Sequence, residues 1–309
     1  MILSCGEALI DMLPRRTAAG EEAFAPYAGG ALFNTAIAVG RLGAPSGFFS
    51  GLSSDLFGER LRAVLEASNV DASPAHVSSR PTTLAWVRLR DGNASYTFYD
   101  ENTAGRMLSE EDLPVLGPEV DALFLGGISL VGEPAAATFE VLQAREAGAR
   151  VTMIDPNVRP GFVAVMGNEA AYRARLGRMI ARADIVKVSD EDLRWLGGTG
   201  DAEALARALL AQGPRLVLVT LGAEGAVAFS GTATVRVPAE RVTVADTVGA
   251  GDTFNAGVLV ALHRAGLLTK AAVATLSEGA IRDALALGVR AAAVTVSRPG
   301  ADPPWAHEL

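Results

Sequence analysis

Hydrophobic and polar positions alternate along the chain with two different periods. Short apolar runs predict buried strands at residues 1–10, 46–52, 122–125, 151–154, 185–188 and 216–220. Apolar residues spaced three and four apart predict helices that begin near Leu32 and Phe254, and further helices at 56–65, 135–147, 170–181 and 202–211. Such an alternation of strand and helix is typical of a mostly parallel sheet with helices packed against it.

Residues 82–101 interrupt this alternation. Two strand-like runs, 82–89 and 95–99, flank Asp91-Gly92-Asn93, a sequence that favours a tight β-hairpin turn. Residues 14–26 are small and polar, which predicts a loop or an exposed edge segment. An antiparallel hairpin within a parallel-sheet chain indicates a second, smaller layer. Together with residues 12–28 it could form a lid over one end of the sheet.

The remaining pattern adds no second independent unit. We expect a hairpin-like segment at 225–237, an alanine-rich stretch at 271–293 and a last strand at 294–297. No repeat or linker divides the 309 residues. The expected fold is therefore a single α/β domain over residues 1–309. Its mostly parallel central sheet is doubly wound, with helices on both faces, and a small β lid is inserted at about 12–28 and 82–101.

Composition narrows the possible partners. The chain is 50% hydrophobic, which is enough for a large buried core. The net charge of −8, with no block of basic residues, argues against nucleic acid and anionic membranes as partners. Cys5 is the single cysteine, which excludes a disulfide framework. The N-terminus does not resemble a secretory signal and no apolar run is long enough to span a membrane, so we expect a cytoplasmic protein.

The turn Gly249-Ala250-Gly251-Asp252 joins a loop to a predicted helix. Glycines at such a junction let the backbone approach a ligand closely. The first N–H groups of a helix lack carbonyl partners, so this turn predicts a site for an anion, most plausibly a phosphate. Asp252 could simply cap the helix, or it could accept the proton of an attacking hydroxyl during phosphoryl transfer. Asp246, in the loop before the turn, could bind a cation.

Other polar residues follow predicted strands, where ligands of such sheets bind. Gly29-Gly30 and Asn34 enter a helix, either as an ordinary turn or as a pocket that hydrogen-bonds a polyol. Asp11 ends the first predicted strand and could accept two sugar hydroxyls. In Asp155-Pro-Asn157-Val-Arg159-Pro160, the prolines alone could explain a turn, whereas Arg159 would suit phosphate or sugar recognition.

Two further strand ends carry weaker signals. Lys187-Val-Ser189 begins a helix whose first turn holds Asp192; these residues fit a helix cap, or acidic groups that orient Mg²⁺ through water. Thr220-Leu-Gly222 and Gly225 form a turn that is uninformative by itself. The chain has no Walker lysine motif, no G-x-S-x-G elbow and no G-x-G-x-x-G after the first strand, which argues against P-loop enzymes, serine hydrolases and typical dinucleotide-binding dehydrogenases.

The chain resembles the ribokinase-like sugar kinases of the phosphofructokinase B type in two motifs and in the order of these motifs along the sequence. The pattern D-T-x-G-A-G-D is present at 246–252, and G-G-x-x-x-N at 29–34. The resemblance extends over essentially the whole chain. Within the family, the stretches 5–14, 98–105 and 155–160 are most similar to bacterial fructokinases.

The resemblance implies ATP-dependent phosphorylation of D-fructose, most plausibly at the 6-hydroxyl, with Asp252 as general base and the amides of Gly249, Ala250 and Gly251 as anion hole. Because proton transfer is late in a loose transition state, we expect that an unperturbed carboxylate suffices. The implied sugar-binding residues are Asp11, Gly29, Gly30, Asn34, Phe98, Asn157 and Arg159. The implied ATP-binding residues are Lys187, Ser189, Thr220, Gly222, Gly225, Ala284 and Ala292. A monovalent cation such as K⁺ would bind at Asp246, Val248, Thr295, Arg298 and Gly300.

One element departs from the family pattern. The family's N-x-x-E occurs here as Ser189…Asp192, so the carboxylate that would hold Mg²⁺ through water is one methylene shorter. Other substrates remain open, among them 2-keto-3-deoxygluconate, ribose and nucleosides, as does a catalytically silent sugar- or nucleotide-sensing protein. The exposed edge of the lid could also hold a second copy in a homodimer.

Overall fold

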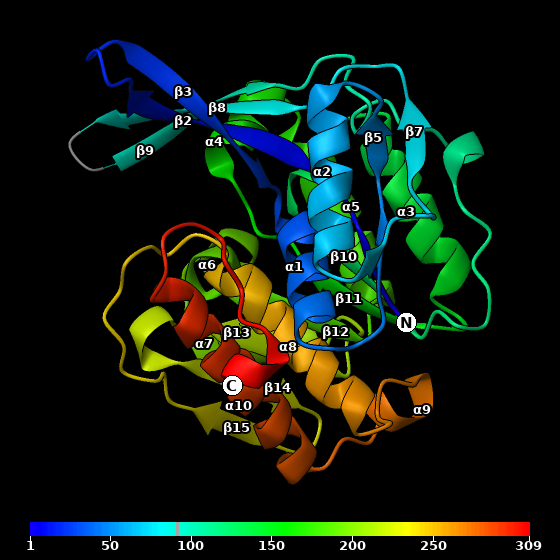
Figure 1. Ribbon diagram of the computed structural model, residues 1–309. Helices are drawn as coiled ribbons and strands as arrows, with labels where there is room; N and C mark the ends of the chain where they lie inside the picture. Colours follow the sequence, from blue (N-terminus) through cyan, green and yellow to red (C-terminus); the bar gives the residue numbers. More distant parts are fainter. Residues whose placement is uncertain (91–92) are drawn as a thin grey trace.

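The structure is a computed structural model that describes residues 1–90 and 93–309. A nine-stranded sheet in the order β15-β14-β13-β12-β11-β10-β1-β4-β6 forms its centre (Figure 1). Only β14 and β15 run antiparallel to their neighbours. The strands are β1 (Ile2–Cys5), β4 (Ser46–Phe49), β6 (Val70–Asp71), β10 (Ala122–Gly126), β11 (Val151–Asp155), β12 (Ile185–Ser189), β13 (Leu216–Thr220), β14 (Ala226–Ser230) and β15 (Thr234–Val237).

Helices cover both faces of this sheet, as expected for a doubly wound fold. The helices are α1 (Ala31–Arg41), α2 (Leu56–Ala67), α3 (Ala135–Glu146), α4 (Pro160–Met166), α5 (Glu169–Arg182), α6 (Asp190–Gly197), α7 (Ala202–Leu210), α8 (Ala250–Arg264), α9 (Lys270–Val273) and α10 (Glu278–Val296). One core lies under α1, α2, α8 and α10, and the other under α3, α5, α6 and α7. Successive strand residues enter opposite cores, since side chains alternate along a strand: Ile2 lies in the first core and Leu3 in the second.

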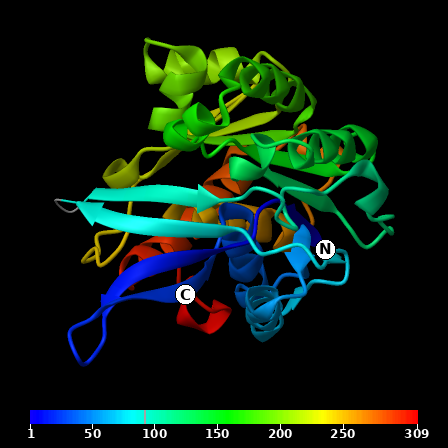
Figure 2. The same ribbon diagram turned by 90° about the horizontal axis from the view of Figure 1, so that it is seen from above.

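A second sheet of four strands lies beside the first, in the order β3-β2-β8-β9. Its strands are β2 (Leu9–Arg16), β3 (Glu22–Gly29), β8 (Leu84–Arg90) and β9 (Asn93–Tyr99). The predicted β8–β9 hairpin is present, although Asp91 and Gly92 of its predicted turn lie outside the described residues. The β2–β3 hairpin (blue) and the β8–β9 hairpin (cyan) project beyond the central sheet in both views (Figures 1 and 2). Phe98 of β9 packs edge-on against Phe162 of α4, with ring centroids 4.8 Å apart.

Two strand predictions near the N-terminus were wrong in detail. The run at 1–10 is divided, because β1 ends at Cys5 and the chain turns at Gly6, where a Cβ would lie 2.5 Å from Leu32 Cγ. Asp11 therefore does not end the first strand but lies inside β2. The run at 46–52 also divides, into β4 and β5 (Gly51–Ser53), which pairs with β7 (His76–Ser78). Residues 14–26 were predicted as a loop or an exposed edge segment; they belong mostly to β2 and the edge strand β3, so the second alternative is confirmed.

Two helices differ from expectation. Residues 294–297 were predicted as a strand, but α10 continues to Val296 because Thr295 packs inside the protein and hydrogen-bonds Thr253 of α8 at 2.9 Å. Tertiary packing thus overrides the β preference of a short branched run. The turn with two prolines contains α4, which begins at Pro160. Proline at the first helical position costs no hydrogen bond, since that N–H has no helical partner.

Helices α8 and α10 approach each other unusually closely. A Cβ on Gly257 of α8 would lie 2.6 Å from the Cα of Gly288 of α10. Glycines at both positions let the two backbones touch, and this contact anchors the helix that carries Asp252. Among the described residues, no helix combines the length and apolar character needed to cross a lipid bilayer.

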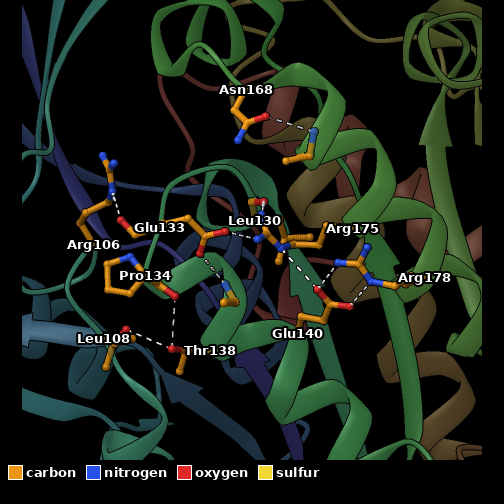
Figure 3. A network of polar contacts seen from close by, with 12 residues as sticks. Arg106, Leu108, Leu130, Glu133, Pro134, Thr138, Glu140, Asn168, Arg175 and Arg178 are labelled. Atoms are coloured by element: carbon orange, nitrogen blue, oxygen red, sulfur yellow. Dashed lines mark hydrogen bonds and ion pairs between the residues drawn. The ribbon is translucent and has the colours of Figure 1, made fainter.

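On the other face, charged side chains join α3 to α5 (Figure 3). Arg175 of α5, whose side chain is only 8% exposed, forms ion pairs with Glu133 and with Glu140 of α3, the latter at 3.5 Å. Arg178 donates a hydrogen bond to each carboxylate oxygen of Glu140, at 2.7 and 2.8 Å. The hydrogen bonds from Arg178 are the main cause that lowers the pKa of Glu140. This network fixes α5 against α3 and lies away from α8.

Candidate functional site

The N-terminus of α8 presents free backbone amides. Gly249 caps the helix in a left-handed conformation, with a φ of 77°, and contributes no side chain. A Cβ there would lie 2.7 Å from the Cβ of Ala301, so only glycine fits. Within residues 1–90 and 93–309, no acceptor is hydrogen-bonded to the N–H groups of Gly251 and Asp252. These amides and the helix dipole together can hold an anion.

Asp252 lies in the first turn of α8. Its carboxylate Oδ2 accepts a hydrogen bond from the Asn34 amide of α1 at 2.9 Å, and only 9% of the residue is exposed. The pKa of Asp252 is raised to about 7, mainly by burial and to a smaller extent by the charge of Asp155, while the Asn34 hydrogen bond and the positive charges of Lys187 and Arg159 oppose the rise. The pKa of Asp252 is thus perturbed, and the expectation that an unperturbed carboxylate would suffice stays a prediction. A pKa near neutrality suits a general base.

The predicted sugar-binding residues of the N-terminal half gather near Asp252. Asn34 contacts Asp252 itself, and its own N–H bonds the carbonyl of Gly30 at 2.8 Å. Asp11 of β2 places a carboxylate oxygen against Gly29, where a Cβ would collide with it. Burial raises the pKa of Asp11 to about 6. Asn34 of α1 thus meets Asp252 of α8, while Asp11 of β2 lies against Gly29 just before α1.

Asn157 and Arg159 approach the same region from the end of β11. Asn157 adopts a left-handed conformation with a φ of 41°, and its N–H bonds Asp155 Oδ1 at 3.1 Å. Arg159 is exposed at the start of α4, and its charge is near enough to lower the pKa of Asp252. Phe98 covers α4 from the lid. The role of these three residues in sugar binding stays a prediction.

Sequence reasoning missed two residues that face the site. Tyr96 of β9 stacks on Phe98 with centroids 6.0 Å apart. Burial raises the pKa of Tyr96, as do the nearby charges of Asp11 and Asp246, whereas Arg159 lowers it. Strand alternation could have found Tyr96, since it shares a face with Phe98. Glu7 was also missed: its carboxylate accepts the Ala31 N–H at 3.0 Å and so caps α1, where Gly30 has no side chain to do so.

A buried charge pair lies behind the α8 turn. Lys187 of β12 was predicted to bind ATP, and in the structure its ammonium pairs with Asp155 Oδ2 at 2.9 Å. The Asn255 amide of α8 bonds the same oxygen at 2.7 Å. Asp155 and Asn255 were not among the predicted site residues. Asn255 could have been found because it lies one helical turn after Asp252.

The predicted ATP-binding residues lie at neighbouring strand ends. Ser189 ends β12 and is paired in register with Thr220, which ends β13. Gly222 begins the short helix η3 (Gly222–Glu224) that follows, and Gly225 ends it. Ala284 is packed inside the main core, whereas Ala292 is only partly buried. Their contact with a nucleotide stays a prediction.

Asp192 forms the helix cap that its position suggested. Its Oδ2 accepts the Ser189 N–H at 3.3 Å, while Ser189 Oγ accepts the Asp192 N–H at 3.0 Å. The other oxygen accepts the Val158 N–H at 2.9 Å. Burial raises the pKa of Asp192, and the charge of Asp155 adds to it. The capping interpretation is thus correct, and a role toward Mg²⁺ stays a prediction.

The residues predicted to hold a monovalent cation lie together beside α8. Asp246 accepts hydrogen bonds from the Val248 N–H at 3.1 Å and from the Gly300 N–H at 2.9 Å. The carbonyl of Thr295 accepts the Arg298 N–H at 3.1 Å. In the part of the chain that the structure describes, no group of three or more His, Cys, Asp or Glu side chains could hold a metal ion. A cation here would therefore depend largely on backbone oxygens.

Comparison with known proteins decides the family. The model of the pfkB family carbohydrate kinases matches residues 1–308. The chain belongs to this family. Its Asp246–Asp252 turn and Gly29-Gly30…Asn34 segment, which carried the resemblance in the sequence, are the segments that Asn34 and Asp252 join in the structure.

Several pfkB relatives are similar over most of their length. A fructokinase of Rhizobium leguminosarum bv. trifolii is 56% identical over 283 residues, which are 92% of this chain and 86% of the relative. Fructokinase from Xylella fastidiosa with bound ATP superposes with a TM-score of 0.87 at 31% identity, covering 97% of this chain and 93% of that one. A double mutant of Vibrio cholerae O395 fructokinase in a fructose-, ADP- and potassium-bound form superposes with a TM-score of 0.84 at 27% identity. The match covers 97% of this chain and 93% of that one.

Membership of the pfkB family makes the protein a phosphotransferase that acts on a sugar hydroxyl. Such a reaction needs a group to accept the hydroxyl proton and fixed positive potential for the transferred phosphoryl group. The α8 turn of this pfkB chain offers both at one helix tip. The buried Asp252 lies beside unpartnered amides there.

Proposed function

We propose that this protein is an ATP-dependent fructokinase that transfers the γ-phosphoryl group of ATP to D-fructose, at the 6-hydroxyl. The observation that carries the proposal is the buried Asp252 beside free amides at the α8 tip, with its pKa raised to about 7 by burial. The 56% identity with a fructokinase over most of the chain supports fructose as the acceptor.

In the proposed mechanism, the sugar lies between the lid and the α8 tip. Its hydroxyl oxygen forms a bond to the γ-phosphorus as the bond from that phosphorus to the bridging oxygen breaks, and ADP leaves. Asp252 accepts the hydroxyl proton and later returns it to solvent. The amides of Gly249, Ala250 and Gly251 stabilise the charge on the phosphoryl oxygens. The lid, through Phe98, excludes water that would otherwise take the phosphoryl group.

The remaining contacts are proposed from the resemblance and from their location. We assign the sugar hydroxyls to Asp11, Gly29, Gly30, Asn34 and Asn157. Arg159 is exposed near Asp252 and suits either the sugar or the phosphate. The nucleotide would lie along the ends of β12 and β13, against Ser189, Thr220, Gly222 and Gly225. Ala292 is better placed than the core residue Ala284 to wall the adenine.

Two metal ions fit the residues present. Both oxygens of Asp192 already accept an amide hydrogen bond, so Asp192 suits contact with a hydrated Mg²⁺ through water better than direct ligation. When bound, Mg²⁺ would neutralise part of the charge on the ATP phosphates. We assign a monovalent cation to the oxygen-rich loop of Asp246, Val248 and Gly300 with Thr295 and Arg298. A relative in a potassium-bound form supports this assignment.

The outer face of the lid supports a homodimer. Phe24 and Tyr99 are exposed and pack against Trp86, with ring centroids 4.4 and 6.4 Å away. Because side chains alternate along strands, this aromatic face is opposite to the one that carries Asp11 and Phe98. We propose that a second copy covers it in a cytoplasmic dimer, with no nucleic acid or membrane partner. Sedimentation should show a dimer that Trp86→Glu dissociates; a monomeric wild type would contradict the assignment.

A panel of acceptors tests the proposed function. ADP release should be fastest with D-fructose, and slower with 2-keto-3-deoxygluconate, ribose and nucleosides at equal concentration. Faster turnover of 2-keto-3-deoxygluconate would contradict fructose as the substrate, but the protein would still be a sugar kinase. Absence of ADP release with every acceptor would favour a sugar- or nucleotide-sensing protein. The position of the new phosphate on the product, read by ³¹P–¹H NMR, tests the 6-hydroxyl.

A further inference from the structure

The buried pair of Asp155 and Lys187 lies behind the α8 tip, and the proposed function leaves it without a defined role. We propose that Asp155 is a positioning residue: its carboxylate holds the Lys187 ammonium beneath Gly251 and ties α8 to the sheet through Asn255. This inference rests on the proposed function, since it concerns how the same phosphoryl-transfer site is held.

The strand register brings the pair together. Met153 and Ile154 of β11 pair with Ile185 and Val186 of β12, so Asp155 and Lys187 occupy the next pair of positions. Both side chains point toward the core beneath α8, as strand alternation requires. They are 3% and 4% exposed. A charge pair at this depth is costly to form and gives little net stability, so its presence calls for another explanation.

Asn255 connects the pair to the catalytic turn. It lies three residues after Asp252 on α8, and therefore on the same face of the helix. Its Nδ2 donates to Asp155 Oδ2 at 2.7 Å, the same oxygen that receives Lys187 Nζ at 2.9 Å. One carboxylate oxygen thus fixes both an ammonium and the second turn of the helix that carries Asp252.

The ammonium lies against the backbone of the anion-binding turn. A Cβ on Gly251 would be 3.2 Å from Lys187 Nζ, which is the one atom within 4 Å among the described residues once the neighbouring residues and the backbone of α8 itself are set aside. The glycine therefore leaves room for the cation to approach the turn. A positive charge held there adds to the field of the helix N-terminus where charge develops on the transferred phosphoryl group. Without Asp155, the flexible lysine stem would have no fixed partner at this depth.

The pair of Asp155 and Lys187 could instead have a purely structural role. The pH profile of kcat/KM distinguishes that role from the proposed positioning role. The charged groups that act on Asp252 are Asp155 of β11, Lys187 of β12 and Arg159 at the start of α4. Asp155 raises the pKa of Asp252, and Lys187 lowers it. Removing one charge of the pair should therefore move the acid limb of kcat/KM in a direction set by its sign. Lost stability alone would not move that limb.

The chain offers a matched control. The other lysine, Lys270, forms an ion pair with Asp184 at 2.8 Å. Asp184 precedes β12 and is also buried, but it lies at the opposite end of that strand from Ser189. Asp184→Asn breaks a similar pair away from the site and should leave the pH profile and kcat unchanged.

The experiment compares kcat, the KM for fructose and the pH profile in wild type and five variants, one of them the Asp184→Asn control. Asp155→Asn should lower kcat about tenfold to a hundredfold, change the fructose KM less than threefold, and move the acid limb to lower pH by about half a unit. Lys187→Met should move the limb to higher pH, and the double variant should return it toward wild type. Asp155→Glu, which keeps the charge, should retain more activity than Asp155→Asn.

The inference is overturned if Asp155→Asn and Asp184→Asn have the same effect, or if the two single variants do not move the limb in opposite directions. Should Asp155→Asn fail to fold, Lys187→Met and the double variant still test the direction of the movement. Failure of the proposed function has a different signature. Near-normal turnover in Asp252→Asn would show that Asp252 is not the general base. Slow turnover of fructose by the wild type would show that another sugar is the substrate, and the pH profiles would then be measured with that sugar.

Discussion

The buried carboxylate of Asp252 should make the enzyme less stable while it makes the enzyme active. Burial raises its pKa from the ordinary 3.8 to about 7. The unfolded chain then ionises more readily than the folded one, so stability is lost as the pH rises from about 4 to about 7. A difference of about three pKa units corresponds to about 4 kcal/mol at most, since each unit is worth about 1.4 kcal/mol.

The substitution Asp252→Asn removes this penalty and keeps an oxygen that can accept the Asn34 hydrogen bond. We expect the variant to be more stable than wild type at pH 8, by up to about 4 kcal/mol, and the gain to be much smaller at pH 5. Its kcat should fall about 10²- to 10⁴-fold, the usual contribution of a general base.

Chemical unfolding of the ligand-free proteins at pH 5 and pH 8 measures the stability difference, and ADP release measures kcat. Asp11→Asn is a control for a second partly buried carboxylate, whose pKa is raised only to about 6. A stability gain for Asp252→Asn that is equal at both pH values would refute the linkage argument. Near-normal turnover would refute the assignment of the base, whatever the stability.

Three further outcomes follow from the same contacts. Asp11→Ala should raise the fructose KM far more than the ATP KM in initial-rate kinetics; equal increases would count against a sugar contact. Asn34→Leu removes a hydrogen bond that lowers the pKa of Asp252, so the acid limb of kcat/KM should move to higher pH, and an unchanged limb would contradict this. Glu140→Gln takes an ion-pair partner from the buried Arg175 and should cost about 2 kcal/mol in urea unfolding, with kcat unchanged; a loss of kcat would tie α3 to the site.

The local pattern was enough to predict most elements. Short apolar runs identified most strands of the central sheet, and apolar residues spaced three and four apart identified most of the helices that cover it. Asp91-Gly92 and the strand-like runs on either side identified the β8–β9 hairpin. The Gly249–Gly251 turn was recognised because glycine and an unpartnered helix start have a local physical meaning. The family, and with it the class of reaction, followed from the order of such segments along the chain.

The predictions of secondary structure were wrong where contacts between segments far apart in the sequence, rather than the local pattern, determine the conformation. Residues 294–297 have the composition of a strand, yet they continue α10 because Thr295 meets Thr253 across the helix contact. Asp11 was placed at the end of β1 because nothing local indicates that the chain turns at Gly6 to start the lid. At that turn a Cβ would collide with Leu32, more than twenty residues away in the chain, so glycine is required by a contact that the local sequence does not reveal.

The sequence by itself determined which residue types are available for chemistry and on which kind of element each would lie. Only the tertiary structure decided how those residues behave. The pKa of Asp252 depends on burial and on charges from β11 and β12, and Lys187 lies against Gly251 because those strands pair in register beneath α8. Electrostatic energies depend on distance and on the surrounding medium, and neither exists until distant segments of the chain have packed together.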